Sequence, residues 1–156
     1  MSRLVVLLCG APGAGKTTAA HESGLTVYDR DDPQWPDERT FKAGISRLAS
    51  DPHAQAVVIR CGASSSARAK AAALIGATHV YLVTADQKEL ARRIVKRARP
   101  DARNSLAALK SWAADFDNND GVEPFPGWST LGPSGVGPVG TKTTPRVAHS
   151  SSDWAW

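Results

Sequence analysis

The sequence of 156 residues is poor in cysteine, methionine and aromatic residues, and it lacks a long hydrophobic run. Its longest uninterrupted apolar stretch extends only from Leu4 to Cys9, whereas a transmembrane helix needs about 20 apolar residues. A secretory signal would need about 7 to 15 of them and a small-residue cleavage site. Two cysteines are also too few for a disulfide scaffold. We therefore expect a protein of a reducing compartment, the cytoplasm, with no membrane segment.

The remaining composition is that of a globular protein. Hydrophobic residues make up 42% of the sequence and charged residues 22%, close to the globular averages of about 45 to 50% and about 25%. A typical domain has roughly 100 to 200 residues, which favours one compact domain. Cys9 and Cys61 each stand at the end of an apolar segment. Because neither has a recognisable base partner, we interpret both as free thiols that serve packing.

Short apolar segments alternate with helix-compatible segments along the first half of the chain. The apolar segments, which we predict to be buried strands, are residues 4–9, 25–28, 56–60 and 79–83. Helices are expected near 16–23, 37–50 and 65–75. This alternation predicts an α/β fold with a parallel sheet flanked by helices and joined by right-handed crossovers. Ligands bind beyond the carboxyl ends of such strands.

Two further helices are expected in the second half of the chain. Residues 87–99 have an apolar face that includes Leu90 and Val95 and an opposite face rich in lysine and arginine. Pro100 ends this helix. A second apolar stripe predicts a helix from about 104 to 117. We expect the segment of about 86–104 to form a helical lid.

The composition changes after residue 120. Glycine, proline, serine and threonine make up more than half of residues 121–156, without a helical or strand period. We therefore predict a domain of residues 1–120 and an irregular Gly/Pro/Ser-rich C-terminal tail of residues 121–156. The tail contains Trp128, Trp154 and Trp156, which are unusual in a solvated linker. We expect it to dock either on its own domain or on a protein partner.

Residues 10–17 match the phosphate-binding motif G-x-x-x-x-G-K-[ST] between a predicted strand and a predicted helix. Its glycines let successive N–H groups face a polyphosphate, and the helix N-terminus adds its positive end. The motif predicts that Lys16 contacts the β- and γ-phosphates of ATP or GTP and that the Thr17 hydroxyl binds Mg²⁺. The expected nucleotide-binding residues are Gly10, Ala11, Pro12, Gly13, Ala14, Gly15, Lys16, Thr17 and Thr18.

Two missing features narrow the class of protein. The sequence has no [NT]-K-x-D run for guanine recognition. The strand predicted at 56–60 ends in Arg60 and Cys61, where ATP-driven motors keep an acidic residue for Mg²⁺. A small ATP-dependent kinase fits this combination better than a GTPase or a motor.

Carboxylates gather directly after the second predicted strand, in the run Asp29-Arg-Asp31-Asp32-Pro-Gln34. In a kinase, a carboxylate at this place can accept the proton of the attacking hydroxyl. The structural alternative is that aspartates before a proline form a turn or cap a helix. The neighbouring phosphate loop favours the functional interpretation.

On these residues the sequence resembles the kinase domain of phage-type polynucleotide 5′-hydroxyl kinases, over about residues 3–118. That family has an Arg-Asp-Asp run after the strand, here residues 30–32. Its lid helix carries Glu-Leu and two arginines four residues apart, here Glu89-Leu90, Arg93 and Arg97. The resemblance implies a P-loop NTPase-type kinase fold with ATP and Mg²⁺ as cofactors. It also implies a cytoplasmic enzyme, acting in the host cytoplasm if the chain is phage-encoded.

The resemblance also implies roles for single residues. Asp31 is then the general base and, with Thr17, a ligand of the metal. Lys16, Arg93 and Arg97 contact the transferring phosphoryl group, and residues four apart on a helix do share one face. Asp32 and Gln34 contact the acceptor. Two positions depart from the family pattern: Gln34 replaces an arginine that holds the substrate's 3′-phosphate, and residues 61–63 replace an Asp-Thr-Asn run.

The charge distribution leaves the acceptor open. The formal net charge is +4, with basic residues in excess over 86–110 and acidic residues in excess over 22–51. A basic lid suits a nucleic acid substrate and equally suits ATP. The first choice of acceptor is the 5′-hydroxyl of DNA or RNA. The alternatives are a modified DNA base, a nucleoside or another small metabolite, or an ATP-binding interaction module without catalysis.

Overall fold

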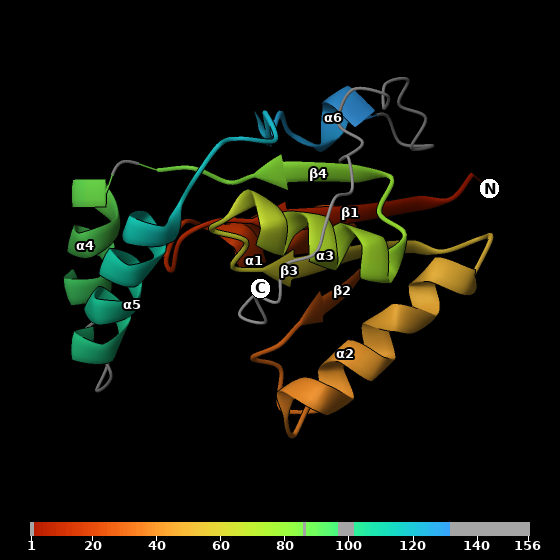
Figure 1. Ribbon diagram of the computed structural model, residues 1–156, viewed down its shortest axis with the longest axis horizontal. Coiled ribbons are helices and arrows are strands. Elements are labelled where there is room, and N and C mark those ends of the chain that lie inside the picture. The colour runs from red at the N-terminus through yellow and green to blue at the C-terminus, as the bar shows by residue number, and fades with distance from the viewer. Residues whose placement is uncertain (1, 86, 97–101, 132–156) are drawn as a thin grey trace.

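The computed structural model describes residues 2–85, 87–96 and 102–131 (Figure 1). All paired strands are parallel, in the order β2-β3-β1-β4-β5. This arrangement confirms the α/β sheet predicted from the sequence. The elements in chain order are β1 (Leu4–Cys9), α1 (Lys16–His21), β2 (Thr26–Asp29), α2 (Glu38–Ser46), the 3₁₀ helix η1 (Arg47–Ser50), β3 (Gln55–Arg60), α3 (Ser65–Ile75), β4 (His79–Leu82), α4 (Gln87–Lys96), α5 (Ala102–Asp115), β5 (Glu123–Pro124) and α6 (Trp128–Leu131).

Strand β1 lies at the centre of the sheet, and all of its residues are buried. Alternate side chains point to opposite faces. Val5 and Leu7 pack in the cluster formed by α2, η1 and α3, whereas Val6 and Leu8 pack on the side of α1 and α6. Helices α4 and α5 lie side by side beyond the carboxyl ends of β1 and β4 (Figure 1). Within the described ranges, no helix is long and apolar enough to cross a membrane.

The folded unit extends past the predicted boundary at residue 120. Strand β5 pairs with β4, and the backbone N–H of Phe125 donates to the Leu82 carbonyl at 2.9 Å. The Trp128 indole donates to the Ala19 carbonyl at 2.6 Å, and Leu131 is fully buried. Residues 121–131 were assigned to the tail because β5 and α6 are too short to leave a periodic pattern. The rest of the tail, with Trp154 and Trp156, lies outside the described residues.

The two cysteines have different surroundings. Both thiols are free, and Cys9 is buried while Cys61 is exposed. Burial raises the pKa of the Cys9 thiol to about 12, so it is inert at neutral pH. Because Cys61 is exposed, the interpretation of this cysteine as a packing residue is wrong. Strand β3 ends at Arg60, and the chain leaves the sheet at the next residue.

Arg3 closes the amino-terminal edge of the sheet, opposite the phosphate-binding motif. Its guanidinium donates to four backbone carbonyls, those of Leu48, Asp51, Ile75 and Gly76. The last carbonyls of a helix have no partner within the helix, and Arg3 satisfies them at the ends of η1 and α3.

His79 is a buried histidine on β4. Its Nδ1 lies 2.9 Å from the Thr78 hydroxyl, and its ring stacks on Tyr81. Its Nε2 is buried and has no hydrogen-bond partner among the described residues. Because burial disfavours the charged imidazolium, the pKa of His79 is lowered from 6.5.

We predict that the free energy of unfolding decreases as the pH falls below about 6.5. The unfolded chain binds a proton at His79 there more readily than the folded chain, and this difference favours unfolding. Urea denaturation between about pH 5 and about pH 7.5 should show a steeper acid slope in the wild type than in His79→Gln. The exposed His53 supplies the control. If His53→Gln removed the slope and His79→Gln kept it, the assignment to His79 would be wrong.

Candidate functional site

The phosphate-binding motif forms the loop between β1 and α1. Gly13 and Gly15 have φ angles of 81° and 100°, in the left-handed region that favours glycine. A Cβ at Gly10 would lie 2.6 Å from the Val83 carbonyl oxygen. These positions require glycine, and they fit a loop whose amides curl around a polyphosphate. The other expected nucleotide-binding residues, Ala11, Pro12, Ala14, Lys16, Thr17 and Thr18, lie in the same loop or in the first turn of α1.

Lys16 lies under this loop. Its ammonium donates to the carbonyls of Gly10 at 2.5 Å and of Ala11 at 3.4 Å. Burial lowers the pKa of Lys16 from 10.5, and the nearby Asp29 and Asp31 carboxylates partly oppose that shift. The ammonium group is therefore held against the backbone of the phosphate-binding motif.

Thr17 and Asp29 bring a hydroxyl and a carboxylate together. The Thr17 hydroxyl donates to Oδ2 of Asp29, the last residue of β2, at 3.1 Å. The described residues contain no group of three or more His, Cys, Asp or Glu side chains that could hold a metal. Mg²⁺ in phosphoryl-transfer sites is commonly bound by one or two carboxylates together with the substrate's phosphates. Thr17 and Asp29 fit that donor set.

The loop after β2 presents two further carboxylates. Oδ1 of Asp32 accepts a hydrogen bond from the Gln34 amide at 3.0 Å, which makes Asp32 a turn-forming residue. The Asp31 amide donates to Asp29, but the exposed Asp31 carboxylate has no hydrogen-bond partner among the described residues. Asp31 is therefore the carboxylate of this loop that remains free to accept a proton.

The cations beside this loop are paired with one glutamate. Glu38 lies 3.3 Å from Arg30, 2.5 Å from Arg60 and 3.8 Å from Lys42. Arg60 is buried at the end of β3, with its guanidinium over the Phe41 ring. Beside this loop, the two arginines are therefore partly neutralised, while Asp31 and Asp32 remain exposed.

Helix α4 directs one arginine at the phosphate loop. Nη1 of Arg93 donates to the Gly13 carbonyl at 3.3 Å, and its Nε pairs with Glu89 at 3.3 Å. Arg92, on the exposed face, pairs with Glu89 as well. Arg97 lies outside the described residues. A single lid arginine, Arg93, is thus brought to the phosphate site by the described part of the chain.

Two residues at this edge were missed as functional candidates in the sequence. Asp29 belongs to the predicted carboxylate run, but nothing in that run marks it as the carboxylate that meets Thr17. Arg60 lacked a signal, because its partner Glu38 is on α2 and only the folded sheet brings the two together.

No protein-family model matches this sequence, and no curated protein matches it. Solved structures do match. They include the protein APE1195 (TM-score 0.51, 18% identity, covering 80% of this chain and 86% of that chain). A gluconokinase from Sinorhizobium meliloti 1021 also matches (TM-score 0.50, 18% identity, 77% and 81%), as does an uncharacterized protein from Eubacterium ventriosum ATCC 27560 (TM-score 0.50, 14% identity, 70% and 70%). At these identities the likeness shows the fold alone, a parallel sheet flanked by helices.

We predict that the affinity for ATP·Mg²⁺ falls as the pH rises from neutral toward 10.5, the ordinary pKa of lysine. Lys16 has its pKa below 10.5 and loses its charge earlier than an exposed lysine. Calorimetric titration across this range measures the effect. Lys16→Arg keeps its charge throughout, so its weaker affinity should be independent of pH. Constant wild-type affinity up to about pH 10 would contradict this placement of Lys16.

Proposed function

We propose that the protein transfers the γ-phosphoryl group of ATP to a hydroxyl. The observation that carries this proposal is the convergence of four features at one edge of the sheet. They are the phosphate loop with Lys16, the Thr17–Asp29 pair, the free Asp31 carboxylate and the Arg93 guanidinium that points at the loop.

The residues divide the reaction among them. The acceptor oxygen forms a bond to the γ-phosphorus as the bond to the β,γ-bridging oxygen breaks, and ADP leaves. Asp31 takes the hydroxyl proton, while Lys16 and Arg93 stabilise the charge on the transferring group. Thr17 and Asp29 would hold Mg²⁺, whose charge neutralises the phosphate oxygens. In the same proposal, Asp31 also helps to hold the metal, and Arg97 contacts the phosphates.

Arg60 distinguishes this site from that of an ATP-driven motor. It occupies the end of β3, where motors keep an acidic residue for Mg²⁺. Here that position is a cation paired with Glu38. Asp29 and Asp31 come from the β2 side of the phosphate loop, and we place the acceptor there.

An uncharged small molecule with hydroxyl groups is the acceptor that this edge favours. Asp29, Asp31 and Asp32 face it with negative charge, and Arg30 and Arg60 are both engaged by Glu38. Gln34 supplies an amide where a cation would be needed for a phosphate. A gluconokinase shares the fold, but this acceptor argument rests on the residues of the chain itself.

A polynucleotide 5′-hydroxyl is the second candidate acceptor. The exposed Arg92 and Lys96 give α4 a basic outer face, and such a face suits the phosphates of DNA or RNA. The resemblance of residues 30–32 and of the lid to polynucleotide kinases supports the same choice. Asp32 and Gln34 would then contact the terminal nucleotide, and a hydroxyl on a modified base is a related possibility.

Replacing Asp31 tests the proposed base. Asp31→Asn should lower the rate of phosphoryl transfer by at least about 100-fold, since general bases contribute roughly 10²- to 10⁴-fold. Binding of ATP without Mg²⁺ should remain near the wild-type affinity, because within the described residues no hydrogen bond joins Asp31 to the phosphate loop. The matched variant Asp32→Asn, in the same turn, should lose far less activity. Near-normal transfer by Asp31→Asn would exclude it as the base.

The acceptor is tested with labelled ATP·Mg²⁺ and a panel of 5′-hydroxyl DNA and RNA, modified-base DNA, nucleosides and small polyols. A small acceptor should give a KM that changes little between low and moderate salt. A polynucleotide acceptor should give a KM that rises steeply with salt. Tight ATP binding without transfer to any member of the panel would favour a non-catalytic interaction module.

A further inference from the structure

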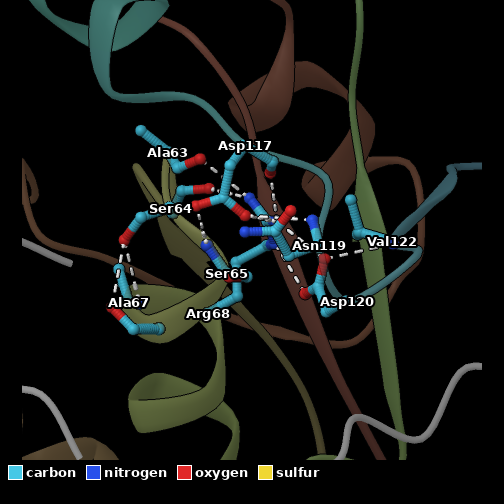
Figure 2. Close-up of polar contacts among 11 residues, drawn as sticks. Ala63, Ser64, Ser65, Ala67, Arg68, Asp117, Asn119, Asp120 and Val122 are labelled. Carbon is cyan, nitrogen blue, oxygen red and sulfur yellow. Dashed lines mark hydrogen bonds and ion pairs between the residues drawn. The ribbon is translucent and has the colours of Figure 1, made fainter.

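The largest fully buried side chain is a charged one outside the proposed catalytic group. Arg68, on α3, is 0% exposed. Its Nε and Nη2 pair with the two carboxylate oxygens of Asp120 at 2.9 and 2.7 Å. Nη1 donates to the carbonyls of Gly62 and Ala63, and Nη2 donates to the carbonyl of Asp117 (Figure 2). All five guanidinium N–H donors are used.

The bonds of Arg68 join segments that are far apart in the sequence. Gly62 and Ala63 belong to the loop that leaves β3, and Asp117 and Asp120 belong to the loop that follows α5. The two loops also bond directly, since the Asp117 amide donates to the Ala63 carbonyl. In addition, the amide of Ser65, the first residue of α3, donates to the Asp117 carboxylate. Arg68 lies between them and fixes the end of α5 to the exit of β3.

Asp117 stays ionised in this cluster. Burial alone would raise its pKa, but hydrogen bonds from the Asn119 and Ser65 amides and the charge of Arg68 hold the pKa of Asp117 below its usual value. A buried arginine is strongly destabilising when it loses its partners. The cluster is therefore expected to stay formed while the two loops are folded.

The residue that follows β3 is hydrogen-bonded to the phosphate loop. The Cys61 carbonyl, one residue before Gly62, accepts from the Gly10 amide at 3.1 Å and from the Trp112 indole at 2.8 Å. A residue of the phosphate loop and a side chain of α5 thus meet at one oxygen. The position of that oxygen depends on the loop that Arg68 holds.

Helix α5 in turn supports α4. Leu109 of α5 and Leu90 of α4 form one buried cluster with Ala11 and Ala14 of the phosphate loop. About one turn further along α4, on the side that faces the same loop, Arg93 reaches the Gly13 carbonyl. A shift of α5 would therefore move the guanidinium that the proposed reaction needs.

We propose that Arg68 is a positioning residue, which together with Asp120 fixes the end of α5 and so aligns Arg93 with the phosphate loop. The fixing of α5 by Arg68 and Asp120 is a property of the folded chain alone. Its consequence for phosphoryl transfer rests on the proposed function.

Hydrogen exchange tests the structural part without nucleotide. Arg68→Lys has too few donors to reach both loops, and Asp120→Asn keeps the shape while removing the charge. Amides of α5 should exchange at least about 10-fold faster in both variants than in the wild type. Arg3→Lys is the matched control, since Arg3 also binds several backbone carbonyls but at the opposite edge. Equal acceleration of α5 in Arg3→Lys, or none in the two variants, would overturn the proposal.

Kinetics and nucleotide binding test the consequence, at a temperature where every variant is folded. With the acceptor that the panel identifies, Arg68→Lys should lower kcat at least about 10-fold and change the KM for ATP less than about 3-fold. In an Arg93→Ala background, Arg68→Lys should cause no further loss, because Arg68 acts through Arg93. If the losses in kcat from the two substitutions multiplied in the double variant, Arg68 would not act through Arg93.

A failure of the proposed function would be recognised separately. If the wild type transferred phosphate to no acceptor, exchange in α4 with AMP-PNP·Mg²⁺ would replace kcat as the readout. Protection of α4 by this analogue in the wild type, and its loss in Arg68→Lys at similar affinity, would support the proposal. Equal protection in the two proteins would overturn it. If the wild type bound no AMP-PNP, the nucleotide site itself would be wrong, and α5 exchange would still decide whether Arg68 fixes α5.

Discussion

Burial of every side chain in β1 requires an apolar layer against both faces of the strand and a hydrogen-bonded neighbour along both edges. A parallel sheet with helices on both sides meets these requirements. At the carboxyl edge of the sheet the chain leaves β1, and the first residue after the strand has little space. Gly10 is confined there by the Val83 carbonyl, and the phosphate loop begins at this point.

The sequence carried enough information for this central part of the fold. Four strands and their helices were predicted, because continuous apolar runs and helical periodicity survive as local patterns. Strand β5 and helix α6 were not predicted, since two and four residues are too few to show a period. Their stability comes from contacts such as the Trp128 indole on the Ala19 carbonyl, across a large sequence separation.

The residues that the sequence suggested for the candidate site belong to contiguous patterns, and their functional roles stay predictions. The phosphate loop is a contiguous motif, and Asp31 belongs to a contiguous run. Arg68 gave no signal, because an arginine within an alanine-rich helix is usually exposed and its partner Asp120 is far along the chain. Asp29 could not be separated from its acidic neighbours until the fold showed which carboxylate meets Thr17.

Both cations of the phosphate site already have partners. Lys16 and Arg93 donate to carbonyl oxygens of the loop itself, so an arriving polyphosphate exchanges these bonds for its own instead of meeting bare charges. Such an exchange yields less net free energy than new contacts would, and it limits how tightly a nucleotide is held. The same carbonyls can take the cations back when the spent nucleotide departs. For the proposed reaction, such a site would favour rapid product release, a step that limits the rate of many enzymes.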